Sequence, residues 1–460
     1  MADKVEKAEP DVQVGQVQYT PEDERRVLRK IDRTFLPLLC LIEFFQYLDK
    51  QAIGYAAVFD LKEDLNMSSG QYSWSVSSFY FGQLLAQYVF IYLMSRFPVT
   101  RFVGCIVIIW GICAACLAAP NGFAGFTAVR LLLGFFEAAI QPAFVIIISS
   151  WYKKDEHSIR LAAWISCNGL SQILGALLMY GVGLSKDTAI ATWRIMFLVY
   201  GGGTLLAGIV WFVLAPLGPD SAWFLDKHEG TIAVARLSSE RLSQDRQSFN
   251  KAQIWDIITD FRAWMLILGG FFNTLASPFA TLVINGLPAG AIQILFIWIV
   301  VVGIRITSFP RYWWGVLACI PSLVGNIGVA ALPSSSHWGI VVCTWLATIL
   351  TPTQVIFLNL IASNIKGNTK KVAASNGYFI LYAAACIASP QLWTKPPRYT
   401  DGVITDIVSL GCAIASFILF GLTAGYENRR RDRLSSVTSD ENSDDCDLTD
   451  RQDLAFRYTL

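Results

Sequence analysis

The sequence predicts an all-α membrane protein that crosses the bilayer twelve times, and three observations support this fold class. First, 54% of the 460 residues are apolar and only 15% are charged, and the mean hydropathy is +0.46. One soluble core cannot bury so much apolar surface. Second, the charged residues cluster before residue 35, between 220 and 262, and after 426. Third, the stretches between them divide into apolar runs of about 20 residues, the length at which a helix spans a bilayer.

The first apolar run begins at Thr34 and is expected to be retained as a membrane-spanning helix. The 33 residues before it are polar and carry charges of both signs. A secretory signal peptide would need a short apolar run close to Met1. The spans predicted from the apolar runs are 34–59, 72–94, 101–119, 123–150, 159–184, 194–215, 263–285, 287–304, 312–332, 338–361, 373–393 and 403–425.

Orientation follows from the lysines and arginines in the short connections, which favour the cytoplasm. They gather on one side of the predicted membrane, at 25–33, 96–101, 153–160, 305–311, 366–371 and 429–431. Both termini and the central segment are therefore predicted to be cytoplasmic. The predicted organisation is a cytoplasmic segment at 1–33, six helices at 34–215, a cytoplasmic loop at 216–262, six helices at 263–425 and a disordered cytoplasmic tail at 426–460.

Five ionisable residues stand out because they are predicted to lie toward the bilayer centre. Glu43, Asp49 and Lys50 fall in the first span, and Arg130 and Glu137 fall in the fourth. An ionisable group near the bilayer centre costs at least about 2.5 to 3.5 kcal/mol, so each needs a partner or a function. At a rise of about 1.5 Å per residue, Glu137 lies near the midplane, Arg130 roughly 9 Å outward and Asp49 and Lys50 roughly 4 to 5 Å outward.

The fourth span carries its polar residues on one helical face. Arg130, Gly134, Glu137 and Gln141 follow one another at intervals of four, three and four residues. Because their depths match that of Asp49 and Lys50, the polar faces of the first and fourth spans can meet.

These charges allow two interpretations. In the functional one, Lys50 and Arg130 attract a carboxylate, while Asp49 and Glu137 carry protons because desolvation disfavours their charged forms. Proton and anion binding would then be linked through a shared free energy. In the other, the same residues form a static ion-pair network that joins the two spans.

Two glutamines in the second span are further candidates. Gln83 and Gln87 lie one turn apart, so they either line a polar path and bind substrate or form hydrogen bonds between helices. The sequence shows no Walker-type loop, Gly-x-Ser-x-Gly or His-Glu-x-x-His motif. No enzymatic activity, metal, cofactor, nucleic acid or obligate protein partner is expected, and a proton gradient is the expected energy source.

Several stretches together resemble the major facilitator superfamily, and within it the fungal allantoate permease-like branch of the anion:cation symporters. They are Tyr47-Leu-Asp49-Lys50, Tyr92-Leu-Met-Ser-Arg96-Phe-Pro98, the stretch from Arg130 to Pro142, Ser363 to Lys371, Pro397 to Gly402, and Leu448-Thr449-Asp450-Arg451 through Phe456-Arg457-Tyr458. The resemblance covers nearly the whole chain. It implies two six-helix bundles that take up a small organic anion with protons, with Asp49 and Glu137 in proton coupling and Lys50 and Arg130 at the substrate.

The resemblance also shows where this chain departs from its relatives. Lys50 replaces the arginine common in wider relatives, and Glu43 replaces an uncharged residue. About a dozen residues seen in relatives are absent around Thr281 to Pro288, which predicts a shortened connection between the seventh and eighth helices. We therefore expect a plasma-membrane, proton-coupled symporter of a small carboxylate-bearing nutrient, such as a ureide, a vitamin-like acid or a short peptide. The alternative is a sensor that binds such a nutrient without transporting it, or a relative whose shortened connection has abolished transport.

Overall fold

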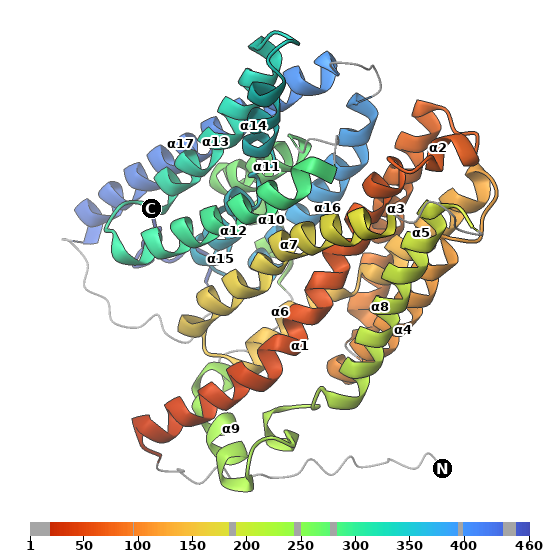
Figure 1. Cartoon of the computed structure of the whole chain (residues 1–460). Helices are drawn as coiled ribbons and strands as arrows, with labels where there is room; N and C mark the ends of the chain where they lie inside the picture. The colour runs from red at the N-terminus through yellow and green to blue at the C-terminus, as the bar shows by residue number, and fades with distance from the viewer. Residues whose placement is uncertain are drawn as a thin grey trace, which may run out of the picture.

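The computed structural model describes residues 19–94, 96–183, 190–242, 250–276, 283–393, 399–435 and 448–460. Within these ranges the regular secondary structure is entirely helical (Figure 1). The helices are α1 (Pro21–Ala56), α2 (Leu61–Asp64), α3 (Ser69–Met94), α4 (Val99–Cys116), α5 (Phe123–Glu137), α6 (Ile140–Trp151), α7 (Lys154–Gly183), α8 (Thr192–Leu214), η1 (Pro219–Ser221), α9 (Lys227–Leu242), α10 (Lys251–Ile258), α11 (Phe261–Leu275), α12 (Val283–Ile306), α13 (Arg311–Ala331), α14 (His337–Ala347), α15 (Thr351–Asn364), α16 (Asn368–Leu392) and α17 (Thr400–Ser435).

The twelve-span prediction is confirmed. Nine helical segments among the described residues are long and apolar enough to cross a membrane, and α5 with α6 and α14 with α15 each count as one. The other three predicted spans correspond to α1, α3 and α11. Of these, α1 carries its charges within the span, and α11 has only 15 residues before it ends at Leu275. The shortened connection was predicted around Thr281 to Pro288. Residues 281 and 282 lie outside the described residues, and Val283 to Pro288 already belong to α12.

Helix α1 begins well before the membrane because its start is capped. The Thr20 hydroxyl accepts a hydrogen bond from the backbone N–H of Asp23, the Asp23 carboxylate accepts one from Thr20, and Pro21 occupies the first turn. Buried residues then recur every three or four positions, for example Val27, Ile31 and Phe35. This spacing turns one face of α1 toward the core and continues unbroken to the charged residues of the span.

Two predicted spans are each broken into two helices. In the fourth span, α5 ends at Glu137 and α6 begins at Ile140. Pro142 has no N–H to donate to the carbonyl of Ala138, so the backbone loses a helical hydrogen bond at this break. In the tenth span, Pro352 stands in the first turn of α15, directly after the break that follows α14. Helix breaks within transporter bundles commonly lie beside the binding site.

Side-chain packing forms two apolar cores among the described residues. The first is built by α1 and α3–α9, and contains the buried Trp110, Trp151 and Trp211. The second is built mainly by α11, α13 and α15–α17, where Phe357 and Phe417 stack with their ring centroids 3.9 Å apart. The two groups stand side by side in Figure 1, with α12 lying along α7. The domain boundaries given above remain predictions.

The central segment 216–262 is largely helical where it is described. Helix α9 packs on α1 and α6, whereas α10 packs on α16 and α11. Each of these helices therefore belongs to a different helical group, with residues 243–249 between them outside the described residues.

The expectation of a disordered tail over 426–460 is wrong for two parts of it. Residues 426–435 continue α17, and residues 448–460 fold back onto α10, α11, α15, α16 and α17. The reason is polar contact, which composition alone does not reveal. The Arg431 guanidinium donates to the backbone carbonyls of Asp450, Asp453 and Phe456 at 2.8 to 3.1 Å. We call residues 448–460 the clasp.

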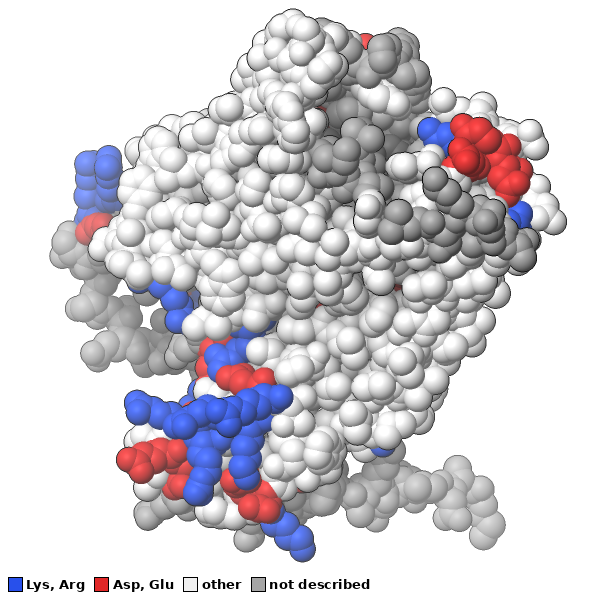
Figure 2. Space-filling model, viewed as in Figure 1, with Lys and Arg blue, Asp and Glu red and all other residues white. Residues whose placement is uncertain are grey.

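Charged side chains gather at the two ends of the molecule. Figure 2 shows them near the start of α1 and the end of α17, and again around α2, with a broad uncharged face between. Exposed apolar side chains such as Leu85, Leu206 and Val213 occupy helices between the two ends. This distribution suits a protein whose middle contacts lipid and whose ends contact water.

Candidate functional site

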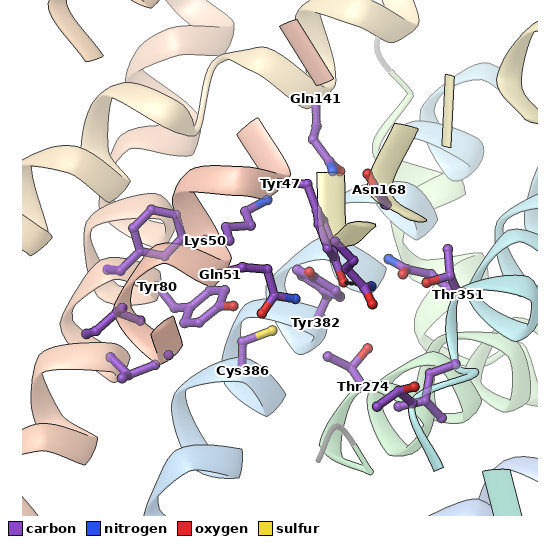
Figure 3. A pocket seen from close by; sticks show the side chains of 18 of the residues that line it. Tyr47, Lys50, Gln51, Tyr80, Gln141, Asn168, Thr274, Thr351, Tyr382 and Cys386 are labelled. Atoms are coloured by element: carbon purple, nitrogen blue, oxygen red, sulfur yellow. Dashed lines mark hydrogen bonds between the residues drawn. The ribbon is translucent and has the colours of Figure 1, made fainter. Parts of the chain in front are cut away.

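A cavity of about 230 Å³ lies between the two helical groups. Figure 3 shows the side chains that enter it. Lys50 and Gln51 come from α1, Tyr80 from α3, Thr274 from α11, Thr351 from α15, and Tyr382 and Cys386 from α16. Its further lining residues include Glu43, Tyr47, Phe79, Arg130, Gln141, Asn168, Gln172, Asn273 and Gln354. The lining is rich in amides and hydroxyls, which is unusual for a space between buried apolar helices.

Helix α1 presents one polar face to this cavity. Glu43, Tyr47, Lys50 and Gly54 recur at intervals of four, three and four residues and all line it. The Lys50 ammonium lies 3.1 Å from a carboxylate oxygen of Glu137, whose side chain is fully buried at the end of α5. The structure therefore brings together the polar faces of the first and fourth spans, as the helical spacing and depth indicated.

Arg130 enters the cavity from α5 and is 1% exposed. Its guanidinium lies over the Phe79 ring, 5.0 Å from the centroid. Its Nε and Nη1 atoms have no hydrogen-bond partner in the described part of the chain. Helices α3 and α5 can cross closely here because Gly134 has no side chain. A Cβ at this position would collide with the carbonyl oxygen of Phe79. This close crossing holds the Arg130 side chain beside the Phe79 ring.

Asp49 is turned away from the cavity. It is 3% exposed and accepts a hydrogen bond from the Thr204 hydroxyl of α8 at 3.0 Å. It remains within electrostatic range of Glu137 and Arg130. The structure thus places Asp49 behind the cavity wall, one residue from Lys50.

Gln83 and Gln87 line a second cavity of about 490 Å³ instead of the first. Lys50, Gln141 and Tyr382 belong to both cavities, so they form the boundary between the two. The second cavity extends to Lys371 near the start of α16, which is the end of the molecule that carries the clasp. The two glutamines therefore lie on a route between the first cavity and that end.

The opposite end is held by contacts between the two helical groups. The Ser77 hydroxyl of α3 donates to the carbonyl of Ile387 in α16 at 2.8 Å, and the Gln391 amide donates to Ser77 at 3.0 Å. Beside the cavity, Gln172 of α7 donates to Gln293 of α12, which donates to Thr351 of α15, both at 2.5 Å. None of these links was predicted, because serines and glutamines in single spans give no signal of their partner.

Sequence reasoning missed two further acids as site candidates. Glu43 was noted as an ionisable residue in the first span and as a departure from relatives but was given no role, yet it lines the cavity and its Oε2 has no hydrogen-bond partner among described atoms. Asp406 of α17 is 0% exposed, and neither of its oxygens has such a partner there. Its position inside the predicted twelfth span was the available signal. Among the described residues, no group of His, Cys, Asp and Glu could hold a metal ion.

Comparison with known proteins gives concordant matches. The family described as the Major Facilitator Superfamily matches residues 39–390. An uncharacterized transporter of Schizosaccharomyces pombe is 35% identical over 96% of this chain and 88% of its own length. The allantoate permease of Saccharomyces cerevisiae is 30% identical over 100% of this chain and 91% of its own length. An inward-open structure of the xylose transporter XylE from E. coli superposes with a TM-score of 0.65 at 12% identity, covering 84% of this chain and 95% of that one.

Proposed function

The chain belongs to the Major Facilitator Superfamily, whose matched relatives are membrane transporters and not enzymes, and from this premise we propose that it carries a small organic anion together with a proton. The anion is a nutrient that bears a carboxylate, and the proton gradient supplies the energy. Transport proceeds by alternating access, in which the two helical groups open the cavity to one side of the membrane and then to the other.

One observation carries the choice of an anion. Arg130 is a buried cation that faces the cavity with two unpartnered nitrogen atoms. A buried charge without a partner is costly because it has lost its hydration. A ligand of opposite charge that pairs with it replaces that hydration, which favours binding. A planar carboxylate matches the forked geometry of a guanidinium through two parallel hydrogen bonds.

The Lys50–Glu137 ion pair offers a direct route to proton coupling. While Glu137 is charged, it holds the Lys50 ammonium at 3.1 Å and competes with any anion for it. A proton on Glu137 removes that competition, and Lys50 is then free to bind the substrate carboxylate together with Arg130. Proton and anion binding therefore favour each other, and by linkage each strengthens the other by the same factor. Losing the proton restores the ion pair and weakens the hold on the anion.

Asp49 has a supporting role in this proposal. Two carboxylates close together in a buried site repel when both are charged, so a proton shared between Asp49 and Glu137 is favoured. Its hydrogen bond from Thr204 fixes it behind Lys50, where it acts on the charge balance without contacting substrate. Gln83 and Gln87 are assigned to the exit route, where they bind the substrate in passing.

We place both termini in the cytoplasm and the chain in the plasma membrane. Arg25, Arg29 and Arg33 are exposed along the start of α1, and basic residues flank the cytoplasmic ends of membrane helices. The plasma membrane rests on the family resemblance.

The test uses the full chain in liposomes that contain a pH-sensitive dye. Radiolabelled small carboxylates are supplied outside at acid and at neutral pH, and uptake is measured together with internal acidification. Accumulation that rises with the proton gradient and acidifies the interior supports the proposal. Binding of a carboxylate without any flux would instead favour the sensor. Uptake that does not change with the proton gradient would refute the proposed coupling of anion transport to protons.

A further inference from the structure

Five acidic or basic residues lie in or beside the first cavity, four of them buried and Lys50 partly exposed, and three of the five are already engaged. Lys50 and Glu137 pair with each other at 3.1 Å, and Asp49 is held outside the lining by Thr204. The remaining two, Glu43 and Arg130, both line the cavity. They are 2% and 1% exposed, respectively.

One of these residues is an acid and the other a base, and both have unmet hydrogen-bonding capacity. The Arg130 Nε and Nη1 atoms and the Glu43 Oε2 atom all lack a hydrogen-bond partner in the described part of the chain. A buried polar atom left unpaired costs about 1 to 3 kcal/mol, and more when it is charged. A ligand that carried only a carboxylate would meet the need of Arg130 and leave Glu43 unpaired.

Asn273 provides a further hydrogen-bond acceptor without a partner among the described residues. Asn273 of α11 donates through its Nδ2 to the carbonyl of Leu350 at 3.5 Å, which leaves its Oδ1 as an acceptor without a partner. Asn273 lines the same cavity as Glu43. The cavity therefore offers a donor in Arg130 and acceptors in Glu43 and Asn273, and a complementary ligand presents an acceptor to the first and N–H donors to the others.

We infer, on the basis of the proposed function, that the substrate is a zwitterion and that Glu43 is the specificity-determining residue that recognises its cationic nitrogen. The substrate carboxylate pairs with Arg130, and an ammonium or similar N–H-bearing cation pairs with Glu43. Because Glu43 offers this second partner, the chain selects against plain acids, which cannot pair with it. The charge carried changes as well: a zwitterion with one proton moves one net positive charge, whereas a monocarboxylate with one proton moves none.

The test compares matched ligands on the purified full chain. The probes are amino acids whose amino group lies at increasing distance from the carboxylate, from β-alanine to 6-aminohexanoate, together with α-amino acids and dipeptides. Each is paired with the acid that lacks the amino group. Binding is read as thermal stabilisation in detergent, and transport as uptake and as current in liposomes, so binding is scored even where flux is absent.

We expect at least one zwitterion to bind at least tenfold more tightly than its matched acid and to carry an inward current. Glu43→Gln should remove most of that preference while plain acids still bind, and Arg130→Ala should weaken both members of the pair. Glu63→Gln, an exposed glutamate of α2, should change neither. The inference is overturned if no zwitterion exceeds its matched acid, or if Glu43→Gln keeps the preference. It is also overturned if that variant loses only proton dependence, which would make Glu43 a proton carrier. Zwitterion-selective binding without flux would retain the inference and refute the transport proposal.

Discussion

Two of the places where the protein buries charged residues, the clasp and the central cavity, differ in how fully those residues are paired. At the clasp, the fully buried Lys370 ammonium contacts carboxylate oxygens of Asp256, Asp260 and Asp450 at 2.7 to 2.9 Å. In the central cavity, Arg130 and Glu43 keep polar atoms without any partner among the described residues.

This difference separates stability from function. A buried charge with several close partners resists movement and defines one arrangement of the helices. A buried charge that lacks partners destabilises the empty protein and stabilises the complex with a ligand. The clasp is therefore expected to hold the second helical group together during transport, while the cavity exchanges its partners in each cycle.

The largest effect is expected from breaking the clasp. Lys370→Ala leaves the buried carboxylates of Asp260 and Asp450 beside each other and beside the partly buried Asp256, and removing one partner of a buried ion pair costs about 3 to 5 kcal/mol. The midpoint of thermal unfolding in detergent should fall by several degrees or more. Lys227→Ala, at an exposed lysine of α9, is the matched control. An unchanged midpoint in the Lys370 variant would show that the clasp does not stabilise the fold.

Removing the Arg130 cation from the cavity should weaken substrate binding without lowering the thermal stability of the protein. Arg130→Ala should cost about 3 kcal/mol of substrate binding, roughly a hundredfold in affinity, because the carboxylate loses its main partner. The unfolding midpoint should stay the same or rise, since an unpaired buried charge is removed. Uptake and thermal unfolding are measured on the same preparation. Arg130→Lys, which keeps the charge without the fork, should recover part of the affinity.

A smaller effect is expected from fixing Glu137 in its neutral form. Glu137→Gln mimics the protonated acid and frees Lys50, so substrate should bind more tightly by about 1 kcal/mol. Proton-driven accumulation should disappear, because no proton is gained or lost there. Equilibrium binding and gradient-driven uptake are compared. Retained acidification with substrate uptake would assign the proton to another residue.

The smallest effect concerns an acid at the edge of the clasp. Burial raises the pKa of the Asp453 carboxyl, but hydrogen bonds from Lys366 and from the backbone N–H of Ala455 outweigh it, so its pKa lies below the usual 3.8. Its stabilising contribution is therefore present above pH 3.8 and is lost as the pH falls through the lowered pKa of the folded state. Asp453→Asn should lower stability by about 0.5 kcal/mol at neutral pH. In thermal unfolding, the difference in midpoint between Asp453→Asn and the unchanged protein should become smaller at acid pH.

The sequence was informative where regular helix geometry controls position. The contact of Lys50 with Glu137 follows from spacing on two antiparallel helices and a fixed rise per residue. The same geometry could not show that Asp49 faces α8 while its neighbour Lys50 faces the cavity, because that depends on how α1 is rotated in its bundle. Hydropathy also could not distinguish one long helix from α5 followed by α6.

The clasp was missed for a different reason. Its residues are polar and few of them are aliphatic, a composition typical of disorder. Its order comes from Arg431, Lys370 and Asn364, which lie outside the clasp and donate to its carbonyl and carboxylate oxygens. Asp406 was missed because it lies near the end of a span, where an acid draws little attention. Whether the site residues have their proposed roles remains a prediction.

The clasp also has a consequence for how the protein is made. Its residues leave the ribosome after Asp256 of α10, Asp260 at the N-terminal cap of α11 and Lys370 of α16. Until then Lys370 lacks its Asp450 partner, and Arg431 lacks the carbonyl groups to which it donates. The second helical group is therefore inserted in the membrane before it is complete. Translation that stopped between α17 and residue 448 would release a chain with every membrane helix present, in which Lys370 lacks Asp450 and Arg431 lacks the carbonyl groups of residues 448–460.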